Sequence, residues 1–319
     1  MKRTATLIVA LLALAAGTAH AAFPGRNGAI VYGYVDGSYG WDDQLGSEAN
    51  FVEKSIRVRT GRDESRFLTG CTEVYLSDSA CDRKSFSDPA LSPDGERVAL
   101  DAGASLALVN FDASDFHLLP AHGQDDGTPA FSPNGSQLAF GSGAPFRYGQ
   151  PSHRSVWIGD ADGADARRLV EGDAPAWSSR SWIAFVRQRT VYRIRPDGRG
   201  LKLLARNSVA PEWSPDGRRL AVSSSGVRNR GTRRMIRRAG VIVMDADGAR
   251  AHLLRADGAT ESPNEIAWSP DGRRLLILSD DLMTIDLRGR LVGDLGESYY
   301  DGAEDVWEMN GIAWQPLPR

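Results

Sequence analysis

The sequence is poor in the residues and motifs that most often carry out catalysis. Its 319 residues include only two cysteines and five histidines. It contains neither a Gly-x-Ser-x-Gly elbow, which presents a nucleophilic serine, nor a His-Glu-x-x-His pair, which binds zinc in many proteases. A catalytic site, if there is one, has to be assembled from residues that are scattered along the chain.

The sequence also lacks an excess of one charge and, beyond its first residues, any long apolar run. It has 38 Lys and Arg against 41 Asp and Glu, a balance that does not suggest a nucleic-acid binder. The apolar run at 7–16 is shorter than the roughly 20 residues that span a bilayer. Lys2 and Arg3 precede it and Ala19-His20-Ala21 follow it, which is typical of a secretory signal.

We therefore predict a signal peptide at 1–21 and a mature domain at 22–319 that is periplasmic or secreted. An uncleaved N-terminal membrane anchor is the alternative. The mature domain is expected to be a monomer without a membrane span. Cys71 and Cys81 are close in sequence and, in an exported chain, predict a disulfide that stabilises by roughly 2.5 to 3 kcal/mol. A metal-binding cysteine pair is the alternative, but no histidine lies near them.

One phrase recurs through the chain: an apolar or aromatic residue, Ser-Pro-Asp-Gly, and an alternating apolar run. Five copies are complete or nearly so, at Pro89–Leu100, Pro129–Phe140, Pro175–Phe185, Pro211–Val222 and Ile266–Ile277. Proline presets φ and glycine supplies a positive φ, so each copy predicts a β-hairpin. A second hairpin follows each copy, with its own turn, as at Asp160–Gly163 and Asp245–Gly248. Four strands per repeat predict a propeller blade.

A sixth copy is divided between the chain ends, at Ile312–Pro316 and Asn27–Tyr32. The sequence thus predicts an all-β, six-bladed β-propeller of four-stranded blades, closed by pairing of the N- and C-terminal strands, which removes two free sheet edges. The copies at 27–32 and 175–185 are one residue short in their turns, so we expect those turns to differ.

The repeated phrase resembles the WD40-like (PD40) repeat of the TolB β-propeller, and the resemblance covers about 23–318. It implies a six-bladed ring and, by analogy, an envelope protein partner. TolB itself has an additional N-terminal domain, whereas here the repeats follow the signal directly. We therefore do not extend the resemblance to membership of the Tol–Pal system.

The topology separates two faces of the disc. Turns between the first and second strands and between the third and fourth strands lie on one face, which we call the turn face. Loops between the second and third strands and between blades lie on the other, the loop face. Three long loops are expected there, at 36–53, 141–154 and 223–240. Rigid scaffolds usually bind through such loops, so the loop face is the predicted recognition surface.

The loop face carries both charges. Its long loops hold basic residues, namely Arg147, His153, Arg154, Arg228, Arg230, Arg233, Arg234, Arg237 and Arg238. Its interblade segments are acidic, with Asp125, Asp126, Glu171, Asp173, Glu261, Glu265, Glu297, Asp301, Glu304, Asp305 and Glu308. The arginines suggest a clamp for carboxylates, phosphates or a partner protein. The alternative is a solvated loop whose charges are neutralised by its acidic neighbours.

Two further groups are candidates for binding. At the expected channel mouth, polar residues precede each innermost strand and could hold a cation or a polar ligand: Asp88, Asp173, Asn264, Glu265 and Asn310. A water-filled polar channel is the alternative. Tyr299, Tyr300 and Trp307 form an aromatic cluster suited to protein or sugar contacts, or to packing within their own loop.

These features favour a non-catalytic propeller that binds an envelope or secreted protein. The alternative is a lyase or hydrolase of an anionic polysaccharide, with its site at the channel mouth and His122 or His153 taking part. His117 and His252 are expected in outer strands. The Asp-x-Asp-Gly sequences at 160–163 and 245–248 are similar to calcium loops but lack the downstream bidentate Glu, so we interpret them as hairpin turns and expect no cofactor.

Overall fold

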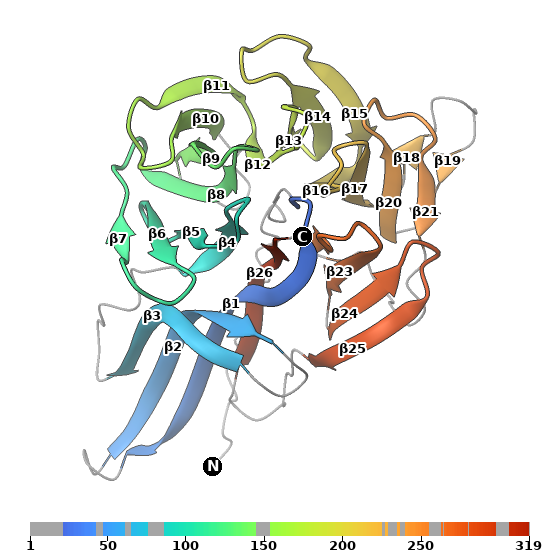
Figure 1. Ribbon diagram of the computed structural model, residues 1–319. Helices are drawn as coiled ribbons and strands as arrows, with labels where there is room; N and C mark the ends of the chain where they lie inside the picture. The colour runs from blue at the N-terminus through green and yellow to red at the C-terminus, as the bar shows by residue number, and fades with distance from the viewer. Residues whose placement is uncertain are drawn as a thin grey trace, which may run out of the picture.

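The computed structural model is a ring of six β-sheets around a central axis (Figure 1). It describes residues 22–42, 47–60, 65–75, 86–144, 154–224, 227–228, 235–236, 240–254, 263, 265–279, 281–297 and 306–318. Each sheet has four antiparallel strands, and one two-stranded hairpin lies outside the ring sheets. The described part of the chain contains no helix that is long and apolar enough to cross a membrane. The predicted six-bladed, all-β architecture is confirmed.

The blades are given in order, each with its innermost strand first. Blade 1 is β26 (Val306–Leu317), β1 (Arg26–Asp42), β2 (Ser47–Arg59) and β3 (Ser65–Tyr75). Blade 2 is β4 (Ser87–Leu91), β5 (Arg97–Asp101), β6 (Leu106–Asn110) and β7 (His117–Leu118). Blade 3 is β8 (Asp125–Phe131), β9 (Gln137–Gly143), β10 (Ser155–Asp160) and β11 (Arg167–Glu171).

The remaining blades follow the same order. Blade 4 is β12 (Asp173–Trp177), β13 (Ile183–Arg187), β14 (Thr190–Ile194) and β15 (Lys202–Arg206). Blade 5 is β16 (Ser208–Trp213), β17 (Arg219–Ser224), β20 (Gly240–Asp245) and β21 (His252–Leu254), with the hairpin β18 (Val227–Arg228) and β19 (Met235–Ile236) between β17 and β20. Blade 6 is β22 (Glu265–Trp268), β23 (Arg274–Leu278), β24 (Asp281–Asp286) and β25 (Leu291–Glu297).

The repeated Ser-Pro-Asp-Gly phrase forms the turn between the first two strands of a blade. In blade 5, Ser214 Oγ donates to Asp216 Oδ1 at 2.7 Å and accepts from the Arg219 amide at 2.9 Å. The Gly217 amide donates to the Ser214 carbonyl at 2.7 Å, and Gly217 has φ +63°, which suits glycine. The side chains of the phrase therefore fix the hairpin that the sequence predicts.

The large apolar residue before the serine of each phrase is buried in the core, and in blades 5 and 6 it is a tryptophan that contacts the preceding blade. Trp213 and Trp268 are fully buried. The Trp213 indole donates to the Ala176 carbonyl of blade 4 at 3.1 Å, and the Trp268 indole donates to the Glu212 carbonyl of blade 5 at 3.1 Å. Each of these two tryptophans buries a large apolar ring and donates its indole N–H to the innermost strand of the preceding blade.

Two predictions on the loop face are wrong in detail. The segment 36–53 is not a long loop, because β1 continues to Asp42 and β2 begins at Ser47, with their register unbroken to the pair Asp42↔Ser47. These strands project beyond the ring in Figure 1. Trp307 lies in β26 and not in an interblade loop. In both places strand pairing within blade 1 extends further than the repeat phrase does.

Gln315 holds the closure of the ring and supplies a test of it. Its Oε1 accepts from the Ala29 amide at 3.3 Å, and its Nε2 donates to the Gly95 carbonyl of blade 2 at 3.0 Å. Replacing Gln315 with methionine keeps the volume but leaves both backbone groups unpaired, so we expect a loss of about 2 kcal/mol. Chemical denaturation should show this loss, whereas Gln137→Met in β9, whose side chain makes no described hydrogen bond, should change stability by less than about 0.5 kcal/mol. Equal losses would contradict a role in closure.

Candidate channel-mouth site

The innermost strands share a backbone irregularity near the loop face. The residue before the repeated proline has a positive φ in four blades: Asp88 (53°), Thr128 (51°), Ala174 (49°) and Ala210 (47°). Each lies at a register shift between the first and second strands of its blade. Such bulges redirect side chains, and a non-glycine residue in this region is strained by about 1–3 kcal/mol. The channel mouth therefore carries the same local strain in four blades.

Arg154 is the centre of this mouth. It lies directly before β10, on the loop face, and only 7% of its surface is exposed. Its Nη1 donates to Asp125 Oδ2 at 2.5 Å, and its Nη2 donates to the Gly141 carbonyl at 3.0 Å. Its Nε lies 2.9 Å from Asp173 Oδ2, an ion pair without the alignment of a hydrogen bond. One guanidinium therefore joins the first residues of β8 and β12, which belong to neighbouring blades.

The second carboxylate oxygen of Asp173, Oδ1, accepts two hydrogen bonds. The amide of Ala174 donates to Asp173 Oδ1 at 2.9 Å, and Thr128 Oγ1 donates to the same oxygen at 3.4 Å. Gly141 leaves the space that this carboxylate occupies, since a Cβ on Gly141 would collide with Asp173 Oδ1. Glycine at this position in β9 is therefore part of the site.

Two more carboxyl groups border the same charges. Asp88 is only partly accessible, and burial raises its pKa to about 7, with the charge of Asp173 adding to the effect and a hydrogen bond with Ser87 opposing it. Burial also raises the pKa of Asp101 well above its usual range, helped by the charge of Asp88. We call Asp88, Asp101, Asp125, Arg154 and Asp173 the mouth cluster.

The mouth cluster contains four carboxyl groups and one guanidinium group. Burial alone would lower the pKa of Arg154, but the charges of Asp173, Asp125 and Asp101 raise it, so the guanidinium stays charged. Asp125 and Asp173 contact that charge directly. Asp88 holds a proton up to about pH 7, and Asp101 also holds its proton more tightly than an exposed aspartate does. The arrangement can hold a cationic group and release protons on doing so.

A metal site of ordinary composition is not seen in the described part of the chain. No group of three or more His, Cys, Asp or Glu side chains there is arranged to hold a metal ion. At the mouth, the guanidinium of Arg154 lies against both Asp125 and Asp173. Two of the carboxylates that a metal ion would need are thus already paired with an internal cation.

The structure brings together only some of the predicted residues. Arg154, Asp173 and Asp88 belong to the mouth cluster. Glu265 is buried at the start of β22, where its Oε1 accepts from the Gly311 amide at 2.7 Å, and a Cβ on Gly311 would lie 2.5 Å from the Asp88 amide nitrogen. Gly311, in the innermost strand of blade 1, therefore lies between Glu265 of blade 6 and Asp88 of the mouth cluster in blade 2.

Other predicted residues fall wholly or partly outside the described residues. Backbone alone is described for Cys71, Arg228, Trp307 and Asn310. Outside the described residues altogether are Cys81, Arg147, His153, Arg230, Arg233, Arg234, Asn264, Tyr299 and Tyr300. The disulfide, the arginine clamp and the aromatic cluster thus remain predictions.

The three histidines within the described residues, His117, His122 and His252, lie outside the mouth cluster. His122 packs against the rings of Phe140 and Trp157, with centroids 5.3 and 6.1 Å away, and its backbone amide donates to Asp126 Oδ2 at 2.7 Å. His117 and His252 lie in the outermost strands β7 and β21, as predicted. The turns at 160–163 and 245–248 are hairpin turns, closed by bonds from Gly163 and Gly248.

Comparison with known proteins supports the fold and gives no information on ligands or activity. No protein-family model and no curated protein matches the sequence. Among solved structures, TolB from Acinetobacter baumannii has a TM-score of 0.59 and 16% identity, covering 91% of this chain and 67% of that chain. The chain has a TolB-like propeller fold.

Other structures agree with the TolB-like fold. A putative TolB from Agrobacterium tumefaciens has a TM-score of 0.56 and 13% identity, covering 90% of this chain and 99% of that chain. A chain of a nidogen/laminin complex has a TM-score of 0.59 and 12% identity, covering 91% of this chain and 100% of that chain. At such identities the likeness concerns the path of the chain and says nothing of its ligands.

Proposed function

We propose that this TolB-like propeller is an exported, non-catalytic binding protein that recognises an envelope or secreted partner protein through its loop face. The mouth cluster takes a cationic group of that partner, such as a lysine or arginine side chain. The observation that carries the proposal is the surplus of carboxyl groups around one buried guanidinium at the channel mouth.

The energetics of the cluster support a binding role. Burying several carboxyl groups together does not stabilise a fold, and carboxyl groups with strongly raised pKa values are typical of functional sites. Asp88 and Asp101 lie beyond the two carboxylates that Arg154 pairs. A partner's ammonium or guanidinium group would replace their protons and relieve the crowding of like charges.

The position of the cluster also supports a protein partner. The mouth opens on the face that carries the segments following β9 and β17, where the predicted arginines lie. Acidic and basic groups on one surface suit a partner with complementary charges of both signs. One structure of similar fold is that of nidogen in complex with laminin, so this architecture occurs in a protein complex.

Affinity capture with matched variants tests the proposal. The mature chain is used as bait in an envelope extract of the producing organism, beside the double variant Asp88→Asn/Asp101→Asn. These substitutions remove the carboxyl groups with raised pKa but keep their shape, so the fold should persist. Asp162→Asn/Asp197→Asn, in two hairpin turns of the turn face, makes the same pair of substitutions away from the mouth.

We expect one partner to be held by the native chain and by the turn-face control. The mouth variant should bind the purified partner at least about 10-fold more weakly, because a single charge-assisted contact contributes about 1.5–3 kcal/mol. A Gly/Ser segment in place of 228–238 should weaken binding as well. If the mouth variant and the control bind equally, the mouth cluster is not the recognition site and the proposal fails.

A specific observation also favours a second candidate function. Burial raises the pKa of Asp88 to about 7 at the channel mouth, and a carboxyl group whose pKa lies near neutral pH can act as a general acid or base. A polysaccharide lyase or hydrolase would turn over an anionic polymer near neutral pH and lose that activity in Asp88→Asn but not in Asp162→Asn. If no uronate polymer in a panel is turned over, the enzymatic function fails and only the binding function is left.

A further inference from the structure

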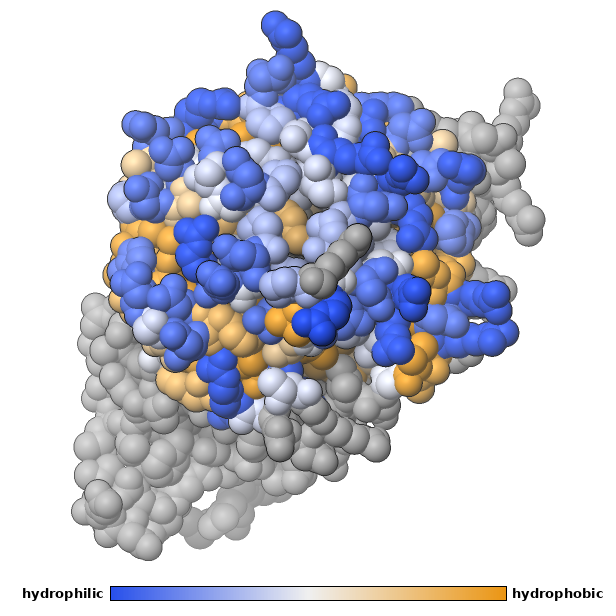
Figure 2. All heavy atoms as spheres, in the orientation of Figure 1, coloured by the Kyte–Doolittle hydropathy of each residue, from blue (hydrophilic) through white to orange (hydrophobic). Residues whose placement is uncertain are grey.

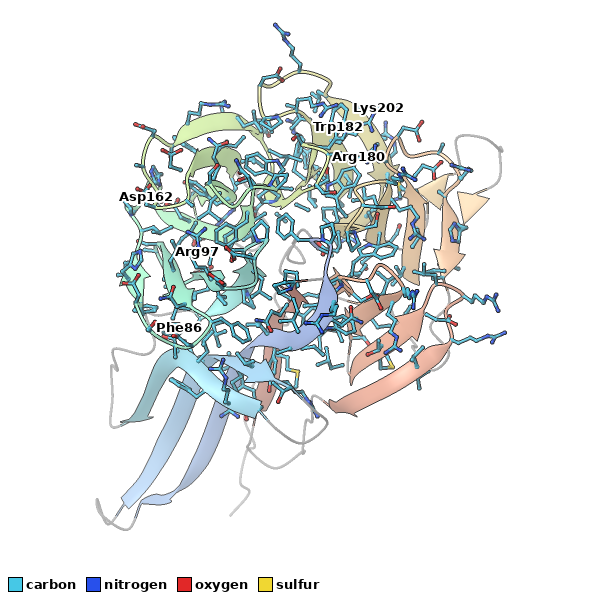
Figure 3. The ribbon with its side chains drawn as sticks, in the orientation of Figure 1. Phe86, Arg97, Asp162, Arg180, Trp182 and Lys202 are labelled. Atoms are coloured by element: carbon cyan, nitrogen blue, oxygen red, sulfur yellow. The ribbon has the colours of Figure 1, made fainter. Side chains whose placement is uncertain are left out.

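A polar groove lies on the turn face between blades 4 and 5, away from the channel mouth. It has a volume of about 610 Å³ and is lined from three turns and from strands β14, β17 and β20, by residues that include Arg180, Arg193, Arg218, Arg250, Asp216 and Asp247. Figure 3 shows Arg180, Trp182 and Lys202 close together in this part of the molecule. Figure 2 shows hydrophilic side chains gathered over the same region, where β14, β15, β17 and β20 meet.

Blade 4 departs from the repeat at the positions that build this groove. Its turn has Ser179-Arg180-Ser181 where other blades have Pro-Asp-Gly or Pro-Asn-Gly, and Ser181 takes the positive φ of 56°. Trp182 replaces the arginine found at the equivalent positions 97, 219 and 274. Arg195 replaces the aspartate found at 160, 245 and 286. Blade 4 thus carries charges around this groove that differ from those of the other blades. The fold does not require this change, so it indicates a local function.

The new basic residues are positioned by stacking and by backbone contacts. The guanidinium carbons of Arg193 and Arg195 lie 4.1 and 3.8 Å from the centre of the Trp182 ring. Arg193 Nη1 donates to the Ala246 carbonyl at 2.5 Å, and Arg180 Nε donates to the Asp216 carbonyl at 2.9 Å. Neutral carbonyl groups orient these guanidinium groups without cancelling their charge, and each guanidinium has five N–H donors.

Within the described residues, Arg180, Arg193 and Arg218 form no ion pair within 4.0 Å. The Nε of Arg193 is buried and has no described hydrogen-bond partner. Burial lowers the pKa of Arg193; the charge of Asp247 opposes this effect and the charge of Arg195 adds to it. The groove thus collects positive charge and leaves a donor inside it unused.

The aspartates of the groove are already engaged in their own turns. Asp216 Oδ1 accepts from Ser214 Oγ at 2.7 Å and from the Arg218 amide at 3.0 Å. Asp247 Oδ1 accepts from the Ala249 amide at 3.0 Å, and Asp245 pairs with Arg250 at 2.5 Å. Five arginines and three aspartates line the groove, which leaves two positive charges in excess.

We propose that this groove binds a doubly charged tetrahedral oxyanion, a phosphate or sulfate group. Two negative charges match the excess of the lining, and guanidinium forks donate to such oxygens in pairs. The groove is open to solvent, so the group is taken either as a free ion or as the end of a larger molecule. This site is independent of the proposed partner recognition on the opposite face.

Calorimetric titration of the mature chain with inorganic phosphate, at constant ionic strength, tests the site. The key variant is Arg218→Gln, because the Arg218 side chain makes no described hydrogen bond or ion pair and its loss should not affect folding. Arg273→Gln is the matched control: Arg273 occupies the same turn position in blade 6 and its amide makes the same 3.0 Å bond, to Asp271. The Trp182 indole NMR signal, assigned with Trp182→Phe, reports where the anion binds.

Saturable binding of phosphate is expected, with a shift of the Trp182 signal and a loss of about 10-fold in Arg218→Gln but none in Arg273→Gln. Inorganic sulfate should compete. Methyl phosphate that binds as tightly as inorganic phosphate would identify the end group of a larger molecule as the ligand, and weaker binding would identify the free ion. The proposal is overturned if binding does not saturate, or if both arginine variants lose affinity alike.

Discussion

Replacing Arg154 with methionine is expected to destabilise the propeller by about 3–5 kcal/mol at neutral pH. The guanidinium is 7% exposed and contacts Asp125 at 2.5 Å and Asp173 at 2.9 Å. Methionine fills a similar volume but leaves two carboxylates in a crowded, largely buried site without a partner. The Gly141 carbonyl loses its donor as well. Calorimetry should show a fall in melting temperature of roughly 10 °C.

Two variants separate this effect from ordinary loss of an ion pair. Arg199 lies 4.0 Å from Asp197 on an exposed turn, with 89% of its side chain accessible, so Arg199→Met should change stability by less than about 1 kcal/mol. Arg154→Lys keeps the charge but cannot reach Asp125, Asp173 and Gly141 together, so it should fall between the native chain and Arg154→Met. If Arg154→Met is no worse than Arg199→Met, Arg154 does not hold the mouth together.

The blades were predictable because the sequence repeats its turn chemistry. Ser-Pro-Asp-Gly defines a hairpin through local bonds alone, as the contacts of Ser269, Asp271 and Arg274 show. These hydrogen bonds join residues close in sequence, so the turn can be recognised without knowledge of the rest of the fold. The divided sixth blade was predictable for the same reason, since Trp314 and Gln315 occupy the positions of an aromatic residue and a serine in the other copies.

The extent of blade 1 and the mouth cluster were harder to predict. The residues from Asp36 onward have little apolar alternation, and their strand pairing depends on β1, β2 and β3 continuing together. Asp101, Asp125 and Arg154 are far apart in sequence and come from β5, β8 and the segment before β10. Only the order of the blades places them together, so Arg154 was predicted as a loop arginine and Asp101 was missed.

The turn-face groove had a signal in the sequence that was not used for function. The short turn of blade 4 was predicted to differ, but all such turns were interpreted as structural. The position of Trp182 between guanidinium groups required the register of β13 and β14, in which Ile183 pairs with Ile194 and so places Trp182 opposite Arg195. A departure from an internal repeat is therefore worth testing as a site before it is treated as loss of the motif.

Asp88→Asn is expected to make the protein more stable at about pH 8 and to leave it nearly unchanged at about pH 4. Burial raises the pKa of Asp88 from 3.8 to about 7, so the folded chain holds this proton more tightly than the unfolded chain does. The stability that this proton provides is complete below about pH 4 and is lost as the pH rises toward 7. A shift of that size corresponds to about 4 kcal/mol, and asparagine has no proton to lose.

Asp271→Asn provides a control of opposite sign. Partial burial opposes the change, but hydrogen bonds from Ser269 Oγ and the Arg273 amide lower the pKa of Asp271, so this carboxylate stabilises the fold at neutral pH and stops doing so in acid. Denaturant titrations from about pH 2 to 8 should therefore show the Asp88→Asn curve rising above the native one between about pH 4 and 8, whereas Asp271→Asn should lie below the native curve by a constant amount above about pH 4 and approach it in stronger acid. Parallel curves for Asp88→Asn and the native chain would mean that Asp88 ionises normally. Diverging curves would show that the channel mouth stores free energy at neutral pH, which binding of a cationic group can release.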